Sequence, residues 1–411
     1  MNPHLLRCRP AIRRLLALAL MAFMATSLRV QAQTFRDLHD FGSIPADGLL
    51  AYGRPMFYGT GLFGTTLGPN DGTMYKISLE NHQYSVIYTF HGADGSAPFG
   101  GLYHRPGDGS GNQYGCATGG GNGSGTIFQF NIKTDVLTTL YTFTPATTVG
   151  GLRVNTDGAY PLSVQYGSGG YLYGVCAQGG ANGTGTLFKW SPSTGLIVLH
   201  TFGALNGSGQ NSDGAFPQQG MNMGLNGVTP YGGSNGAGVL YHITPSGTFM
   251  VLHTFRDNAD GSDNGYQPVG TPLLAGNILY GATTMGGANL LAAGGAIYQY
   301  SFNTRAYTQL YLFSPAPSGT NSDGADPLTP LIRDLNGNLY GACYGGGANG
   351  EGTVFRFTPS TSAYTVLHTF AGGSADGSGP AAPLVLISGA LYSTTLAGGS
   401  ANGGVFFELT P

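Results

Sequence analysis

Two acidic residues stand out because they replace other residue types in a sequence that otherwise repeats. Asp326 stands where other copies of the repeat have Tyr160 or Phe216, and Glu351 stands where other copies have Ser or Thr. Both belong to loops that we expect on one face of the fold. A pair of carboxyl groups could act as general acid and base on a glycan or bind a cation. Two solvated loop acids are the simpler interpretation, and both readings stay open.

Arginine is the second candidate group. Arg54, Arg153 and Arg333 fall in or beside the first strand-like segment of their repeats. In the fold argued below, that strand lines a central channel. A guanidinium group projecting into such a channel would suit an anionic sugar. The sequence therefore offers these three arginines as candidate ligand-binding residues.

Aspartate also recurs in Asp-Gly pairs at intervals of roughly fifty residues. In such a pair Asp bonds its own backbone and Gly adopts a positive φ, so the pair is typical of a turn. We interpret the pairs as turns rather than as a ring of carboxylates or calcium ligands. They begin at Asp47, Asp94, Asp157, Asp213, Asp260, Asp323 and Asp376.

One further position alternates between histidine and tyrosine. This exchange is typical of an aromatic packing slot with a polar tip, and it lies far from the expected axis. We therefore predict no metal site and no cofactor. The position holds His39, His200, His253 and His368 in four copies and Tyr88, Tyr141 and Tyr311 in three others.

The repeat that places these residues contains four strand-like segments. In the sixth copy they are segment A (328–334), B (339–344), C (353–357) and D (364–370). Asn336-Gly337 predicts a tight turn between A and B, and a glycine run joins B to C. Short apolar runs separated by turns predict an antiparallel four-stranded sheet. A glycine inside segment B suits a place where a neighbouring backbone comes close.

The order of the copies predicts how the sheets assemble. The seventh copy ends after its segment C at Pro411, and an unpaired segment D, Leu38–Phe41, lies near the other end of the chain. In a β-propeller the N-terminal strand can complete the last blade and close the ring. The sequence therefore predicts an all-β fold, a seven-bladed β-propeller of four-stranded antiparallel blades in a single domain, 33–411.

The repeat unit resembles a known family. Its copies read approximately Leu-Tyr-Gly-Thr-Thr, Gly-Gly-x-x-Gly-x-Gly-Thr-x-Phe, Leu-x-x-Phe and Asp-Gly-x-x-Pro. This pattern is similar to that of the secreted bacterial tandem-repeat proteins described as GloVer-containing, and the similarity covers nearly the whole chain after the first 32 residues. The resemblance implies a propeller-like fold and export, and it implies no particular activity.

The N-terminus and the charge restrict location and partners. Residues 1–32 combine arginines, an apolar run and Val30-Gln31-Ala32, which predicts a secretory signal peptide removed near Ala32. Residues 33–411 then carry 11 basic and 19 acidic side chains, which argues against nucleic acid as a partner. No stretch is long enough to cross a membrane. We expect a secreted monomer, periplasmic or extracellular.

The cysteines indicate no disulfide framework. Cys116, Cys176 and Cys343 occupy the same segment B of three different copies, and an odd number cannot all pair. We predict free structural thiols.

Two functions follow from these patterns. The first is a binding or scaffold propeller that engages a polysaccharide or cell-surface glycan, or another extracellular ligand, on its glycine-rich loop face. The second is a polysaccharide hydrolase or lyase that uses Asp326 and Glu351 at the channel mouth. The sequence alone leaves open whether the protein is an enzyme.

Overall fold

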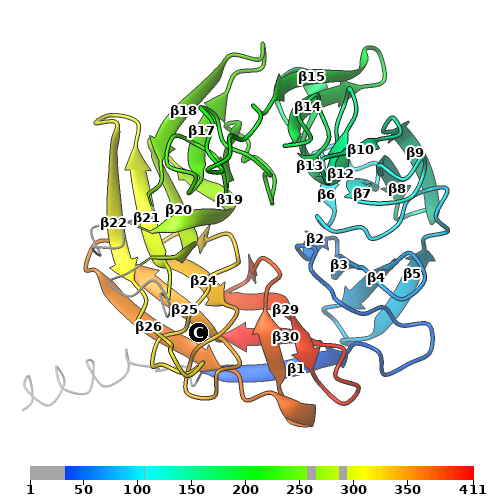
Figure 1. Cartoon of the computed structure of the whole chain (residues 1–411). Coiled ribbons are helices and arrows are strands. Elements are labelled where there is room, and N and C mark those ends of the chain that lie inside the picture. The colour runs from blue at the N-terminus through cyan, green and yellow to red at the C-terminus, as the bar shows by residue number, and fades with distance from the viewer. Residues whose placement is uncertain (1–32, 106, 257–264, 287–293) are drawn as a thin grey trace, which may run out of the picture.

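The structure is a computed structural model that describes residues 33–105, 107–256, 265–286 and 294–411. These residues form seven antiparallel sheets arranged as blades around a central axis (Figure 1). The predicted signal peptide lies outside the described residues. The all-β prediction and the seven-bladed propeller are confirmed.

Within each blade the strands follow one another from the axis to the rim. The first three blades contain β2 (Met56–Tyr58), β3 (Gly61–Thr66), β4 (Thr73–Ser78) and β5 (Tyr84–Thr89); β6 (Tyr103–His104), β7 (Asn112–Ala117), β8 (Thr126–Asn131) and β9 (Val136–Thr142); and β12 (Ala159–Tyr166), β13 (Leu172–Gln178), β14 (Thr186–Ser191) and β15 (Gly195–Thr201). A hairpin of β10 (Thr147–Val149) and β11 (Leu152–Val154) lies between the second and third blades.

The remaining blades keep this order with two local changes. They contain β16 (Asn226–Thr229), β17 (Val239–Ile243) and β18 (Phe249–Thr254); β19 (Tyr266–Ala275), β20 (Ile278–Met285), β21 (Ala296–Ser301) and β22 (Ala306–Leu312); β23 (Ile332–Arg333), β24 (Leu339–Cys343), β25 (Thr353–Thr358) and β26 (Ala363–Thr369); and β27 (Gly377–Pro380), β28 (Val385–Ile387), β29 (Ala390–Gly398) and β30 (Val405–Thr410). In the fourth blade the segment nearest the axis forms no regular strand. In the seventh, the inner strand is split into β27 and β28, which both pair with β29. Two 3₁₀ turns, η1 (Ser168–Gly170) and η2 (Gly373–Ala375), complete the elements.

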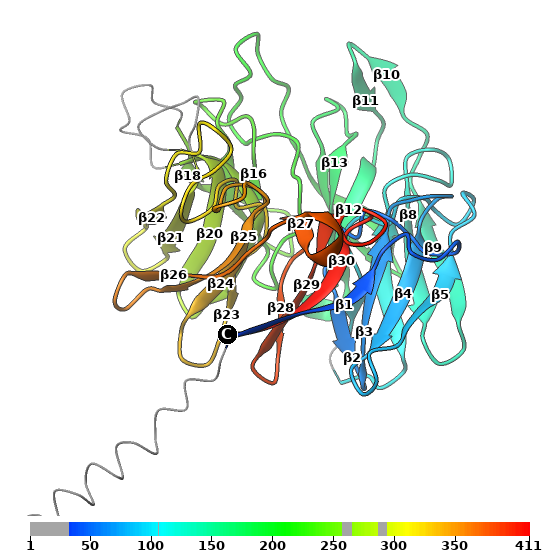
Figure 2. The same cartoon turned by 90° about the horizontal axis from the view of Figure 1, so that it is seen from below.

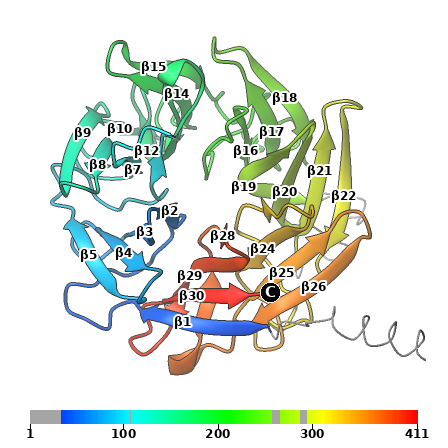
Figure 3. The same ribbon diagram turned by 180° about the vertical axis from the view of Figure 1, so that it is seen from behind.

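The N-terminal strand closes the ring. β1 (Thr34–Asp40) pairs antiparallel with β30, from Thr34 opposite Thr410 to Asp40 opposite Val405. Figure 3 shows β1 lying along the outer side of β30. The predicted closure is therefore confirmed, and the pairing joins the first described strand to the last.

The core lies between neighbouring blades and is built by the second and third strands. In the sixth blade β24 is buried throughout, and the aromatic residues of β25 are buried as well. Gly341 of β24 lies opposite Phe355, and a Cβ at Gly341 would lie 2.6 Å from the ring atom Cζ of Phe355. The atom nearest to a Cβ at Gly341 would therefore belong to an aromatic ring of the adjacent strand, whereas we expected a neighbouring backbone.

The connections separate into two faces. Loops between the second and third strands and loops between blades lie on one face, here called the loop face; the hairpin β10–β11 projects from it in Figure 2. The turns between the first and second strands, such as that after β28, lie at the opposite face. Among the described residues, no helix is long and apolar enough to cross a membrane.

One predicted Asp-Gly turn has a different register. The residue two positions after each turn glycine adopts a left-handed φ, as Asp326 does at 54° after Gly324. In the fifth blade Gln267 has this conformation, at 54°, and so Gly265 takes the place of the turn glycine. The Asp260-Gly261 pair lies outside the described residues. The described residues of the fifth blade place Gly265 at the turn-glycine position, four residues after Gly261.

Candidate functional site

A cavity of about 480 Å³ occupies the axis of the ring. All seven blades contribute to its wall, since each sends the segment before or within its inner strand toward the axis. The wall is mostly apolar, and amide side chains of Gln165, Gln218, Gln219 and Asn222 interrupt it. The cavity therefore combines apolar surface with a few hydrogen-bonding groups, as ligand sites commonly do.

Two of the three predicted arginines line this cavity. Arg54 comes from the first blade and Arg333 from β23 of the sixth, and both are exposed residues. No Asp, Glu, Lys or His lines the cavity, and neither arginine forms an ion pair with an acid of the described chain. The axial cavity is therefore electropositive in a chain whose net charge is −3.

Arg153 lies elsewhere. It belongs to β11 in the hairpin on the loop face, where its guanidinium donates hydrogen bonds to the hydroxyl of Tyr160 at 3.1 Å and to the carbonyl of Gly123 at 2.8 Å. Its Cζ also lies 5.0 Å from the centroid of the Tyr160 ring. The cavity wall does not include Arg153, because the long connection before β12 folds into a hairpin of its own.

Aromatic rings form part of the cavity wall. Tyr52 and Phe99 stack with centroids 5.1 Å apart and planes 24° apart. Burial, and secondarily the nearby phenol of Tyr344, raise the pKa of Tyr52. Tyr52 lines the axial cavity, and Tyr344 lies in the loop after β24. Sequence reasoning missed both, although Tyr344 follows strand β24 where other copies have smaller residues.

The structure places the two predicted acids at neighbouring blade junctions. Asp326 lies between the fifth and sixth blades, where its N–H donates to the carbonyl of Gly294 at 3.1 Å. Glu351 lies between the sixth and seventh, where its carboxylate accepts a hydrogen bond from the hydroxyl of Ser378. Asp326 lines a second, smaller cavity, while Glu351 lines neither of the two described here. Catalysis by this pair stays a prediction.

The aspartates of the Asp-Gly pairs have a structural role beyond the turns that the sequence predicts. The carboxylate of each described repeat aspartate bonds to the His or Tyr of the alternating slot in the preceding blade. The pairs are His39 with Asp47 at 2.8 Å, Tyr88 with Asp94 at 2.5 Å, Tyr141 with Asp157 at 2.8 Å, His200 with Asp213 at 2.8 Å, Tyr311 with Asp323 at 2.7 Å and His368 with Asp376 at 3.2 Å. The His nitrogen or Tyr hydroxyl at the alternating position is therefore the hydrogen-bond partner of the aspartate in the Asp-Gly turn.

The slot also joins blades through ring stacking. Most of its rings lie flat on an aromatic ring that begins the outer strand of the next blade, with centroids 3.6 to 4.2 Å apart and planes within 8° of parallel. The pairs are His39 with Tyr84, His200 with Phe249, His253 with Tyr307, Tyr311 with Tyr364 and His368 with Phe35. Burial, and secondarily the charge of nearby Arg256, lower the pKa of His253 to about 4. This ring remains neutral at physiological pH.

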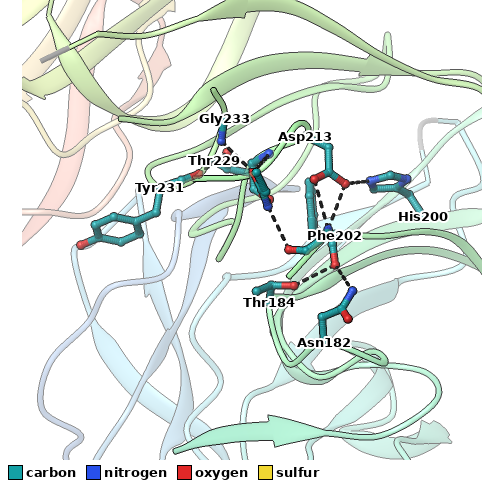
Figure 4. A network of polar contacts seen from close by, with 11 residues as sticks. Asn182, Thr184, His200, Phe202, Asp213, Thr229, Tyr231 and Gly233 are labelled. Atoms are coloured by element: carbon teal, nitrogen blue, oxygen red, sulfur yellow. Dashed lines mark hydrogen bonds and ion pairs between the residues drawn. The ribbon is translucent and has the colours of Figure 1, made fainter. Parts of the chain in front are cut away.

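Figure 4 shows the junction between the third and fourth blades in detail. Asp213 accepts hydrogen bonds from the N–H of Gly203 at 3.1 and 3.0 Å as well as bonding to His200, while Asn182 and Thr184 both donate to the carbonyl of Phe202 at 2.8 Å. The ring of Tyr231 points away from this network. The carboxylate of Asp213 is thus fully engaged in bonds within the fold. The side chain of Tyr231 takes no part in this network and lies at the loop face.

A third residue completes the longest turns. In three copies an asparagine stands two positions before the aspartate, and it bonds across the loop to backbone groups on both sides. Asn211 donates to the carbonyls of Gly203 and Gly214 at 2.9 and 2.8 Å and accepts from the N–H groups of Gly214 and Gly233 at 2.9 and 2.8 Å. Asn155 and Asn321 do the same. The recurring Asn-x-Asp-Gly pattern could have signalled this role.

The other candidate chemistries have structural explanations. Cys116, Cys176 and Cys343 are free and buried, as predicted, and burial raises the pKa of each thiol. Within the described ranges no group of three or more His, Cys, Asp or Glu side chains is arranged to hold a metal ion.

Comparison with known proteins supports the fold and the repeat. Residues 146–290 match the model of the Gloeobacter/Verrucomicrobia repeat. The resemblance to the GloVer family is thereby confirmed, while no curated protein matches the chain.

Solved structures share the architecture at low sequence identity. Oligogalacturonate lyase from Vibrio parahaemolyticus is 11% identical, with a TM-score of 0.53 over 92% of this chain and 97% of the lyase. An oligogalacturonate lyase in complex with manganese is also 11% identical, with a TM-score of 0.51 over 92% of this chain and 96% of the other. At this identity the similarity shows the propeller fold and nothing about the reaction.

Proposed function

We propose that this repeat-bearing propeller is a binding protein that takes an acidic glycan into its axial cavity. The observation that carries the proposal is the charge of the cavity wall: Arg54 and Arg333 line it, and no acidic side chain of the described residues does. An arginine without an internal ion pair keeps its charge and its donors for a ligand carboxylate or sulfate.

The rest of the wall suits a sugar. The stacked rings of Tyr52 and Phe99 provide an apolar platform, and Gln165, Gln218 and Asn222 provide donors and acceptors for hydroxyl groups. The volume of about 480 Å³ is within the range of small-molecule sites. A cavity of this kind would hold a short oligosaccharide rather than a long polymer chain.

The test is calorimetric titration with oligogalacturonate, used as an acidic probe, and with a neutral oligosaccharide of equal length. We expect the acidic probe to bind more tightly and its affinity to fall as salt is raised. Replacing Arg54→Gln or Arg333→Gln should each weaken binding about tenfold, since a charged hydrogen bond contributes about 1.5–3 kcal/mol and 1.4 kcal/mol is tenfold.

Arg305→Gln is the matched control, because this exposed arginine lies in the turn between β21 and β22 and outside the cavity wall. It should bind like the wild type. Equal affinity for the acidic and neutral probes, or full affinity in both cavity variants, would contradict the proposal.

We also propose that the protein is exported and acts outside the cytoplasm as a single domain, 33–411. The support is the N-terminal sequence, with its arginines, its apolar run and Val30-Gln31-Ala32. N-terminal sequencing of the protein from the periplasm or medium should begin at Gln33. Recovery of the intact N-terminus in the cytoplasm would contradict export.

A further inference from the structure

A second recess, of about 260 Å³, opens among the fourth, fifth and sixth blades. Its wall includes Tyr231, Tyr344, Gln267, Met285 and Asp326, and it shares Gln218 with the axial cavity. Within the described part of the chain, no Arg, Lys or His lines it. The recess therefore carries the opposite charge from the cavity that it adjoins.

Asp326 is held rigidly in this recess by its backbone. Its φ is 54°, its N–H donates to the carbonyl of Gly294 at 3.1 Å, and its carbonyl accepts from the N–H of Tyr344 at 2.9 Å. The left-handed conformation is one that aspartate tolerates better than most residues. The backbone of Asp326 is thus held in place by contacts that do not use the carboxylate.

The carboxylate itself has no partner among the described residues. No hydrogen bond or ion pair joins it to another residue that the structure describes, although Asp326 is half-buried and burial raises the pKa of its carboxyl. In other copies the same position holds Tyr160, Phe216 or Gln267, none of which is charged. A half-buried acid without a cation nearby costs free energy that a positively charged ligand would offset.

Two tyrosines flank the acid with accessible rings. Tyr231 is 40% exposed and Tyr344 is 43% exposed, so part of each side chain is accessible to a ligand. The ring of Tyr344 lies against Gly379, where a Cβ would be 2.7 Å from the ring atom Cε2, so this glycine is what allows the ring its place. Tyrosine faces attract organic cations through their electron-rich rings.

We propose that this recess binds the ammonium group of an organic cation, with Asp326 as its counter-ion and Tyr231 and Tyr344 as ring contacts. An anionic ligand would be repelled by the carboxylate. A neutral ligand would leave the charge of the carboxylate unpaired. The site is distinct from the axial cavity, and the proposal does not depend on the acidic-glycan function.

The test is titration of the full mature protein with choline and with its neutral isostere 3,3-dimethylbutan-1-ol at pH 8 and low salt. Choline should bind saturably and at least tenfold more tightly than the isostere. Asp326→Asn, which keeps the size of the side chain, should lose at least tenfold in choline affinity. Tyr344→Leu should lose about fivefold.

Two controls separate this site from the axial cavity and from misfolding. Arg54→Gln should bind choline like the wild type, and Asp326→Asn should keep the wild-type melting temperature and bind oligogalacturonate as before. Equal binding of choline and its isostere, no binding of choline, or full choline affinity in Asp326→Asn would each overturn the proposal. N-acetylglucosamine binding that depends on Asp326, with no choline binding, would instead identify a neutral-sugar site and also overturn it.

Discussion

Replacing Asp213 tests whether the repeat aspartates serve the scaffold rather than a ligand. In the structure its carboxylate bonds to the Nε2 of His200 at 2.8 Å and accepts from the N–H of Gly203 at 3.1 and 3.0 Å, and the His200 ring stacks on Phe249 with centroids 4.0 Å apart. Asp213→Ala leaves both donors without their acceptor and removes one support of the stack between the third and fourth blades.

The magnitude follows from those two donors. Each buried group left unsatisfied costs about 1–3 kcal/mol, and both groups here are partly reached by water, so we expect a loss of about 2–4 kcal/mol in the free energy of unfolding. For a domain of about 380 residues the entropy of unfolding is about 0.8 kcal/mol per kelvin, so Tm should fall by about 3–5 °C.

The assay is thermal unfolding followed by circular dichroism, beside calorimetric titration with oligogalacturonate. Asp108→Ala is the control, because this exposed aspartate lies in the turn between β6 and β7 and should change the free energy of unfolding by less than about 0.5 kcal/mol. A normal Tm together with lost ligand affinity would refute the reasoning, because it would make Asp213 a ligand-binding residue.

Three further predictions concern the closing strand, the core and the thiols. Partial loss of hydration, with the hydrogen bond and charge of Asp40, raises the pKa of Asp37 to about 7, so the folded state holds this proton more tightly than the unfolded chain. Its contribution to stability is therefore present at low pH and is lost as the pH rises toward 7. Urea unfolding of wild type and Asp37→Asn should show the variant gaining relative stability between pH 4 and pH 7; a constant difference would contradict the assignment. Gly341→Ala should lower the free energy of unfolding by about 1–3 kcal/mol, because its Cβ would lie 2.6 Å from Cζ of Phe355; an unchanged urea midpoint would show that the ring moves freely. Because the Cys176 thiol is buried and its pKa is raised, it should react with a disulfide reagent only after unfolding in guanidinium, and fast reaction of the native protein would show that the blade opens.

The repeat made the scaffold predictable. Each copy shows the same order of apolar runs and turns, so the position of one strand fixes that of its equivalents. This is why Arg54 and Arg333 could be assigned to the channel from their place in segment A. It is also why the unpaired Leu38–Phe41 segment predicted that β1 would pair with β30.

Departures from the repeat were harder to predict. Arg153 was assigned to the channel, but the residues before β12 form the hairpin β10–β11, whose short strands carry no repeat signal. In the fifth blade Asp260-Gly261 matched the motif while Gly265 takes the structural position, because a local pattern cannot distinguish two candidate turns four residues apart.

The side-chain contacts between neighbouring blades could not be predicted from the sequence. The partners Asp213 and His200 are 13 residues apart, and the stack of His200 on Phe249 joins consecutive copies. Only the geometry of the ring brings these residues together. The recess around Asp326 was likewise hidden, because the exposure of Tyr231 and Tyr344 depends on packing that no single repeat determines.

The most direct test of the central claim is a crystal structure of the protein with an acidic oligosaccharide bound. The account predicts electron density for the sugar in the axial cavity, with its carboxylates within hydrogen-bonding distance of the guanidinium groups of Arg54 and Arg333. A sugar bound elsewhere, with both arginines free of contact and the cavity filled only by solvent, would contradict it.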